Sequence, residues 1–274
     1  MCKILKVSRS GYYQWLKALP SARSIENQAI KQAIMDEYQA SKGRYGSPKI
    51  TIKLKERGIE ISRPRVARMM QSMGLKSIVS KKHKVMTTDS NHSYRICDNH
   101  LNREFTTDAP SKAWVSDITY IATDQGWLYL TIIMDLFDRK IIGWSMSNNM
   151  TAVDTIVRAW DMAVLNRKPE YNLIMHSDRG VQYACDHFKS ILGNFDVIQS
   201  MSGKGNCWDN AVAESFFKIL KSEMVYHDHF ADHLQAKNAI FEFIEIWYNR
   251  DRIHSALGYI SPQKYHDNYF SKIA

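Results

Sequence analysis

Residues 173–180 read Leu-Ile-Met-His-Ser-Asp-Arg-Gly, and this stretch decides how the rest of the chain is interpreted. Three apolar residues are followed at once by polar residues, charge and glycine, a pattern typical of a buried strand that ends at the surface. The pattern therefore places the carboxylate of Asp178 where a strand meets solvent. His176 would lie two positions away on the same strand face, where a core histidine and a histidine beside a catalytic site are equally compatible with the sequence.

Two further carboxylates have positions that could bring them to Asp178. Residues 210–221 read Asn-Ala-Val-Ala-Glu-Ser-Phe-Phe-Lys-Ile-Leu-Lys, with apolar residues at helical spacing, so Glu214 projects from a helix. Residues 114–121 form an apolar strand pattern that contains Asp117. Asp117 precedes Asp178 with 60 residues between them, and Glu214 follows with 35 between. Acids on a strand, at a strand end and on a helix can converge in space.

Other polar residues are expected around these acids. Asn210 lies four residues before Glu214 and Lys221 lies seven after it, so both share its helix face and could contact DNA. The glycine-containing loop 200–206, which carries Lys204, could close over a substrate, although an ordinary solvated loop would have the same composition.

Three carboxylates without a nucleophilic Ser or Cys suit phosphoryl transfer assisted by two divalent cations. Mg²⁺, or Mn²⁺ in its place, prefers oxygen ligands and leaves room for phosphate and water. We therefore predict that Asp117, Asp178 and Glu214 are catalytic metal ligands. Each also has a structural alternative: an ion pair for Asp117, a turn cap for Asp178 and a surface helix position for Glu214.

Bulk properties describe an ordinary globular chain. Its 274 residues are 45% hydrophobic and 24% charged, which suits one large domain or a few small ones. No apolar run of about 18 residues and no signal-peptide pattern is found, so we expect no membrane span. The four cysteines have no paired spacing, which favours a reducing, cytoplasmic setting.

Charge is unevenly distributed along the chain. Residues 1–110 contain 21 Lys and Arg against 9 Asp and Glu, whereas residues 111–274 contain 16 against 19. A basic part joined to an acid-bearing part is typical of an enzyme that acts on nucleic acid, because phosphate contacts supply affinity independent of sequence. A well-solvated surface is the alternative.

The first 76 residues are predicted to be helical. Residues 1–41 form an N-terminal segment, in which Ser8 or Ser10 could cap a short helix that resembles the second half of a helix-turn-helix whose beginning is missing. A helix over 24–41 would bury Ile25, Ala29, Ala33, Ile34 and Tyr38. Residues 42–76 read as two helices around a glycine-containing turn, the second capped at Ser62 with Val66, Met69, Met70 and Met73 inward.

This second pair of helices is a candidate DNA-binding segment. Residues 42–84 contain 13 Lys and Arg against two Glu. Arg63, Arg65 and Arg68 lie on or near the second helix and are the predicted DNA contacts. A purely structural helical pair is the alternative.

The remaining chain divides into three predicted parts. Residues 77–111 are a polar linker, partly ordered by packing on its neighbours, and residues 225–274 are helical. Between them, residues 112–224 are predicted to form strands at 113–122, 127–135, 140–147, 172–177 and 196–198, with helices at 152–166, 184–192 and 208–223. This order resembles the α/β ribonuclease-H-like fold, in which a mixed sheet of five strands is flanked by helices.

The motifs together resemble a known family. The triad of Asp117, Asp178 and Glu214 with its 35-residue gap, followed by Lys221, is similar to the signature of insertion-sequence transposases and retroviral integrases. Residues 114–120, 176–183, 209–217 and 248–258 resemble the second-reading-frame protein of the insertion sequence 3 family. The resemblance covers nearly the whole chain.

The resemblance implies a DNA transposase that uses Mg²⁺ to cleave transposon ends and to transfer strands by direct transesterification. It implies terminal repeats and target DNA as partners, a homo-oligomer that brings two ends together, and a possible upstream-frame protein fused by frameshifting. An alternative is a DNA-binding accessory or regulatory protein that is catalytically idle without that fusion partner.

Overall fold

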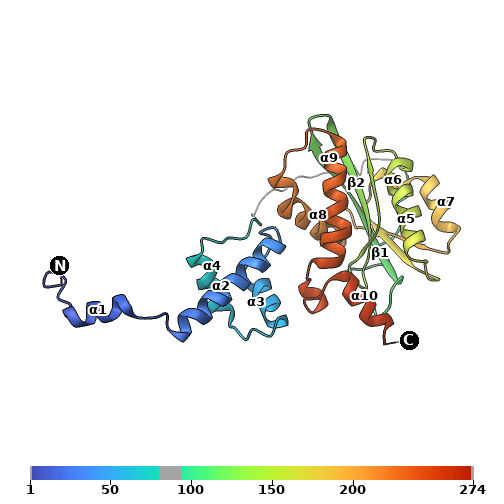
Figure 1. Cartoon of the computed structure of the whole chain (residues 1–274). Coiled ribbons are helices and arrows are strands. Elements are labelled where there is room, and N and C mark those ends of the chain that lie inside the picture. The colour runs from blue at the N-terminus through green and yellow to red at the C-terminus, as the bar shows by residue number, and fades with distance from the viewer. Residues whose placement is uncertain (1, 80–93, 273–274) are drawn as a thin grey trace. The chain divides into compact units, whose positions relative to one another are not determined.

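The computed structural model describes residues 2–79 and 94–272, and its contacts separate two compact units, Met1–Ile78 and Val79–Ala274 (Figure 1). Residues 80–93, within the predicted linker 77–111, lie outside the described residues. In the described ranges no helix combines the length and the apolar character needed to cross a membrane.

The first unit consists of helices. They are α1 (Arg9–Lys17), α2 (Ala22–Ala40), α3 (Ser47–Glu56) and α4 (Arg63–Ser72). The predicted cap of the first helix is confirmed, because the Ser8 side chain accepts a hydrogen bond from the Gly11 backbone N–H. Helix α1 buries none of its residues, so the core of this unit comes from the three later helices.

The buried face of α2 differs from the predicted one. Helix α2 buries Ile30, Ile34 and Glu37, whereas Ile25 is exposed, so of the five predicted positions only Ile34 is fully buried. The reason is an ion pair from a distant position: Arg57, after α3, neutralises Glu37 and allows a glutamate on the buried face. Helix α4 buries Val66, Met69 and Met70 as predicted, and Met73 is half-buried.

The second unit is built on a mixed five-stranded sheet, as the sequence predicted. Its strands are β1 (Ala113–Thr123), β2 (Gly126–Asp135), β3 (Ile141–Ser147), β4 (Ile174–Ser177) and β5 (Ile198–Met201), in the spatial order β3-β2-β1-β4-β5. The first three strands are antiparallel neighbours, and β4 and β5 run parallel to β1.

The predicted position of the last strand was wrong. Strand β5 begins at Ile198, not at Asp196, because Asp196 has a positive φ of 53° that belongs to the turn after α7. The shift places Ile198 beside Ile174 of β4 and His176 beside Ser200.

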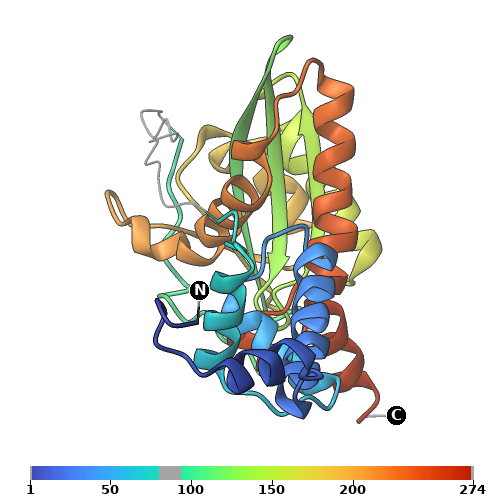
Figure 2. The same ribbon diagram turned by 60° about the vertical axis from the view of Figure 1, so that its left-hand side comes forward.

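Helices cover both faces of this sheet (Figures 1 and 2). On one side lie α5 (Arg158–Asn166), which continues the π-helical turn η1 (Val153–Val157), α6 (Val181–Ala184) and α7 (Asp186–Gly193). On the other side lie α8 (Ala211–Glu223) and α9 (His233–Phe241), which the π-helical segment η4 (Glu242–Asp251) continues, and α10 (Pro262–Phe270) follows.

Helix α5 can reach the sheet closely because β3 has a glycine at the contact. A Cβ atom built on Gly143 would lie 2.2 Å from the Ala159 carbonyl oxygen and 2.7 Å from the Ala163 Cβ. Any larger residue would push the helix away from the core cluster that includes Trp114 and Trp160.

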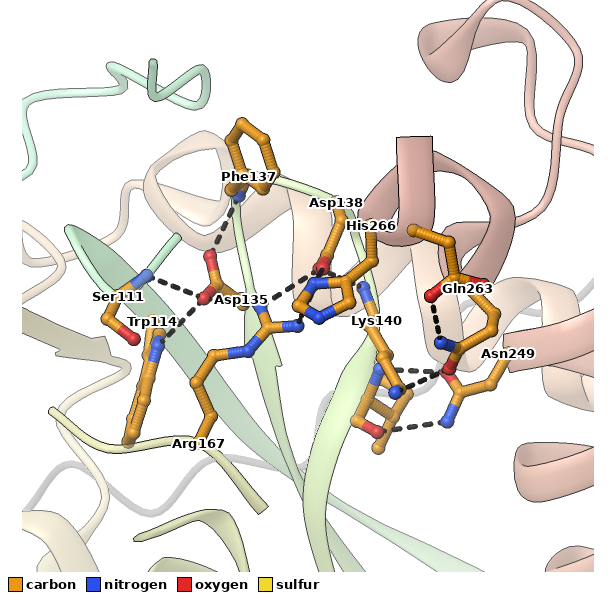
Figure 3. Close-up of polar contacts among 12 residues, drawn as sticks. Ser111, Trp114, Asp135, Phe137, Asp138, Lys140, Arg167, Asn249, Gln263 and His266 are labelled. Atoms are coloured by element: carbon orange, nitrogen blue, oxygen red, sulfur yellow. Dashed lines mark hydrogen bonds and ion pairs between the residues drawn. The ribbon is translucent and has the colours of Figure 1, made fainter. Parts of the chain in front are cut away.

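A buried ion cluster joins the ends of several elements (Figure 3). Arg167, just after α5, places one guanidinium nitrogen 2.6 Å from Asp135 Oδ2 and another 2.6 Å from Asp138 Oδ2. The indole of Trp114 and the backbone N–H of Ser111 donate to Asp135. His266 of α10 lies 3.0 Å from Asp138, so the cluster fastens the C-terminal helix to the sheet.

The two carboxyl groups of this cluster differ in pKa. Burial raises the pKa of Asp135, although the charge of Arg167 opposes this effect. Burial also works against ionisation of Asp138, but hydrogen bonds with His266 and Arg167 outweigh it and lower the pKa. Both carboxylates depend on the same guanidinium.

Replacing Arg167 with Met should therefore destabilise the fold by roughly 3–5 kcal/mol, because two buried carboxylates lose their counter-charge. Thermal unfolding would measure this change. Arg158→Met is the matched control: its side chain is 63% exposed and pairs with Asp154 one turn away, so its loss should cost less than about 1 kcal/mol. Equal losses of stability from the two substitutions would contradict the role of Arg167 as the counter-charge of the buried carboxylates.

Candidate nucleic-acid processing site

Asp117 lies on the central strand β1, opposite Ile132 of β2. It is half-buried, and its Oδ1 accepts a hydrogen bond of 2.9 Å from the Ile118 backbone N–H. Burial raises the pKa of its carboxyl group well above the usual value, and the charges of Asp178 and then Glu214 add to this effect. The Ile118 N–H and Lys221 act in the opposite direction. Asp117 thus lies in a field of like charge.

Asp178 follows the last residue of β4, at the strand end that the sequence indicated. Its Oδ1 accepts the Gly180 backbone N–H at 2.9 Å, so the turn-cap alternative describes a real contact. The same carboxylate raises the pKa of Asp117 and of Glu214. A structural bond and a role in the acid cluster therefore coexist at this residue.

Glu214 lies in the first turn of α8 and is exposed. Partial burial of its carboxyl group raises the pKa, and the charge of Asp178 raises it further. The structure thus brings the three acids within electrostatic reach of one another. Among residues 2–79 and 94–272, however, no three Asp, Glu, His or Cys side chains are positioned to hold a metal ion together.

Lys221 lies two turns after Glu214 on the same helix and close to the acids. Burial lowers the pKa of its ammonium group, and the charge of Asp117 partly restores it. The Nζ atom lies 5.3 Å from the centre of the Tyr120 ring, a distance suited to a cation–π contact. Lys221 is thus a cation held at the edge of the acid cluster.

Asn210 makes a buried hydrogen bond to β1. It is only 4% exposed, and its Nδ2 donates a 3.0 Å hydrogen bond to the carbonyl oxygen of Ser116, the residue before Asp117. The predicted contact of Asn210 with DNA stays a prediction. Asn210 fastens the start of α8 to β1.

The far end of α8 is fixed as well. Glu223 accepts hydrogen bonds from the Trp247 indole at 2.9 Å and from Arg252 Nη2 at 2.8 Å. Both partners lie in or just after η4, the helix that the C-terminal region contributes. With both ends of α8 held, the position of Glu214 relative to β1 is set by packing outside the acid cluster.

His176 is fully buried in the core, and its predicted place beside the catalytic site stays a prediction. Burial lowers its pKa to about 4, so the ring is neutral at physiological pH. Its Nδ1 lies 2.8 Å from Ser200 Oγ, and its Nε2 lies 3.3 Å from Ser202 Oγ. Ser200 Oγ also accepts two backbone N–H groups, from His100 and Leu101, so its own hydrogen must go to Nδ1. His176 therefore joins β4 to β5.

Asp209 and Arg103 are site residues that the sequence interpretation missed. The buried Asp209 carboxylate accepts the Gly203 backbone N–H at 2.8 Å and the Arg103 Nε–H at 2.7 Å. Burial opposes ionisation of Asp209, but these two contacts lower its pKa. These contacts hold the loop after β5. Of the predicted loop 200–206, residues 200 and 201 belong to the strand and only the remainder is irregular. Arg103 is 106 positions away, so local pattern gave no signal for the pair.

The predicted basic contacts fall into two groups. Lys204, Arg63 and Arg68 are exposed. Arg65 instead donates from Nη2 to Glu26 and Asn27 of α2, each at 2.8 Å, and so stabilises the helical unit. The predicted DNA contacts of all four residues stay predictions.

Comparisons with known proteins indicate the family of this chain. Residues 107–207 and 214–270 match the family described as Integrase core domain, and residues 25–83 match the HTH-like domain. Transposase InsF for insertion sequence IS3A of Escherichia coli (strain K12) is 38% identical over 97% of this chain and 92% of its own length.

The chain belongs to the insertion sequence 3 family of transposases. Another relative in this family comparison, the insertion element IS600 uncharacterized 31 kDa protein of Shigella sonnei, is 39% identical over the full length of both chains. Family membership supports a DNA transposase or integrase with a DNA-binding HTH-like domain.

Solved structures bear on the fold of this family member. A chain of the simian T-cell lymphotropic virus intasome, solved in complex with PP2A regulatory subunit B56 gamma, has a TM-score of 0.50 at 12% identity over 85% of this chain and 73% of that one. The HTLV-2 integrase catalytic core domain in complex with magnesium has a TM-score of 0.45 at 18% identity, over 58% of this chain and 98% of that one. The predicted ribonuclease-H-like fold is confirmed.

The raised pKa of Asp117 leads to a stability prediction for the metal-free transposase. Asp117→Asn should raise the melting temperature at neutral pH by roughly 2–4 °C, the shift that about 1 kcal/mol produces in a large domain. Asparagine keeps an oxygen for the Ile118 N–H but removes the repelled charge. The pKa of Asp117 is higher in the folded state than in the unfolded state. The stability advantage of Asp117→Asn should therefore be complete at pH values above the raised pKa and should vanish at pH values below the ordinary Asp range.

Melting curves in a chelator across this pH range would check the prediction. Asp161→Asn, at an exposed position of α5, is the matched control and should leave the melting temperature unchanged. A lower melting temperature for Asp117→Asn at neutral pH would contradict the proposed repulsion.

Proposed function

We propose that this chain catalyses divalent-metal-dependent cleavage at the ends of its insertion sequence, followed by strand transfer into target DNA. The single observation that carries the proposal is the electrostatic convergence of Asp117, Asp178 and Glu214, which come from β1, the end of β4 and α8. Family membership supplies the class of substrate.

The donor set suits Mg²⁺, or Mn²⁺ in its place, because all three groups are carboxylates and hard cations prefer oxygen ligands. Their mutual repulsion, which raises the pKa of Asp117, would be relieved by a cation among them. Asp117, Asp178 and Glu214 would hold two ions after a rearrangement of side chains. When bound, the ions would help to activate the attacking oxygen and to stabilise the leaving oxygen.

The protein's own groups would position the DNA. Lys221, beside Asp117, would contact a phosphate near the bond that breaks, while Lys204 would contact the backbone farther out. Arg63 and Arg68 of the helix-turn-helix-like segment would contact duplex phosphates. The neutral His176 would hold β4 and β5 together beneath Asp178 without taking a proton in the reaction.

The proposed chemistry has two balanced steps. Water attacks a phosphodiester at the element's end, the bond to the 3′ oxygen breaks, and that oxygen leaves as a hydroxyl. The freed 3′-OH then attacks a phosphodiester of the target, where one P–O bond forms and another breaks. No covalent bond to the protein is required. Two ends and one target would call for a homo-oligomer, and an upstream-frame protein would supply end recognition.

Asp178→Asn should lower cleavage of a terminal-repeat duplex by at least about a hundredfold, because several kcal/mol of charge stabilisation are lost. The assay would use the chain joined to its upstream-frame protein, with and without Mg²⁺. Asp161→Asn serves as the control and should cleave normally. Unchanged cleavage by the Asp178→Asn protein would rule the proposal out.

One observation favours a second candidate function. The described acids are not yet arranged to hold a metal ion together, as expected for an accessory DNA-binding protein whose site is completed only in a larger assembly. In that case the isolated 274-residue chain should bind DNA but transfer no strands in Mg²⁺, and addition of the upstream-frame protein should restore transfer. Robust strand transfer by the isolated chain would exclude this candidate.

A further inference from the structure

Trp208 is an unusually exposed aromatic residue beside the acid cluster. It belongs to the short 3₁₀ turn η2 (Cys207–Asn210) that leads directly into α8, six positions before Glu214. The residue is 69% exposed. Tryptophan is highly buried on average in folded proteins, because its large ring gains most from leaving water. The ring is therefore available to a ligand at the edge of the candidate site.

The residues that follow Trp208 are firmly held. The buried Asp209 side chain accepts hydrogen bonds from Gly203 N and Arg103 Nε, and the buried Asn210 side chain donates to the Ser116 carbonyl oxygen. The turn is thus attached to the loop after β5, to segment 94–111 and to β1. Trp208 is exposed on an anchored turn, not on a loose loop, and an anchored aromatic ring loses little conformational entropy when it binds a ligand.

The surroundings of this turn suit one end of a nucleic-acid strand. Asn210 reaches the residue before Asp117, and Glu214 lies on the helix that starts here, so the turn borders the candidate site. Lys204, on the loop that Asp209 holds, is exposed and can meet a phosphate. An indole can stack only on a base whose face is open, because bases inside a duplex are already stacked on each other.

We propose that Trp208 stacks on an unpaired or terminal base of the DNA strand that enters the acid cluster. This proposal rests on the proposed function, since it takes DNA to be the substrate of that site. Stacking would fix the strand end beside Asp117, Asp178 and Glu214 while Lys204 meets the backbone. The contact would depend on whether the base at the strand end is unpaired, and not on which base it is.

The test is a binding measurement with the full chain in a chelator, so that cleavage plays no part. Fluorescence anisotropy would compare a blunt duplex with the same duplex carrying a short thymidine overhang. We expect the wild-type chain to prefer the overhang by about tenfold, within the range measured for one stacked base. Trp208→Ala should lose this preference, and Trp208→Phe should keep most of it.

Two controls separate stacking from charge and from general aromatic exposure. Tyr171 is 74% exposed and lies just before β4, at the strand end opposite Asp178, so Tyr171→Ala should leave the preference unchanged. Because stacking releases no counterions, the wild-type preference should persist when salt is raised. Lys204→Ala should instead weaken binding to both duplexes and reduce the salt dependence.

Three outcomes would overturn the proposal. They are equal affinity of the wild-type chain for the two duplexes, an overhang preference that survives in Trp208→Ala, and a change in oligomeric state on Trp208→Ala with DNA binding unaltered. The last result would mean that the indole contacts a second copy of the chain. Metal-dependent cleavage that is lost in Asp178→Asn but unaffected by Trp208→Ala would leave the proposed function intact and remove only the stacking contact.

Discussion

The guanidinium of Arg167 lies between the buried carboxylates of Asp135 and Asp138 and contacts both. Their desolvation costs several kcal/mol per ion, and a single well-placed cation with full hydrogen bonding offsets it. The contacts of this cluster connect the end of β2, the start of β1, the end of α5 and helix α10 (Figure 3). Asp117 lies three residues beyond Trp114 on that same strand, so the geometry of the acid cluster depends on this arrangement.

The C-terminal region supports the site, although it provides none of the three acids. Glu223 at the end of α8 is bound by Trp247 and Arg252. The side-chain amide of Asn249 accepts a hydrogen bond from the backbone N–H of Ile141 in β3 and donates one to its carbonyl oxygen. These contacts connect the catalytic-core sheet, α8 and the helices after residue 225 into one unit. The C-terminal region of this chain therefore helps to fix the position of the helix that carries Glu214.

The acid cluster and the cluster around Arg167 differ in the groups that compensate their carboxylates. Around Arg167 each carboxylate has a cation within hydrogen-bonding distance; hydrogen bonds lower the pKa of Asp138, whereas burial still raises that of Asp135. Around Asp117, burial and then the charges of Asp178 and Glu214 raise the pKa well above its usual value, and Lys221 is only a partial counter-charge. Such an arrangement weakens the folded state while it favours binding of an added cation, which is a common property of functional sites.

The sequence by itself determined the class of fold, the chain order of its five strands, and the placement of Asp117, Asp178 and Glu214 on a strand, at a strand end and on a helix. Hydrophobic periodicity and turn residues are local, so they could be read without a structure. Tertiary structure decided the remaining features: the Glu37 face of α2, the start of β5, the core role of His176, the buried position of Asn210, and the Asp209–Arg103 pair. The start of β5 follows from the positive φ of Asp196. In the other cases a side chain bonds to a residue distant in the sequence, which a local sequence pattern cannot indicate.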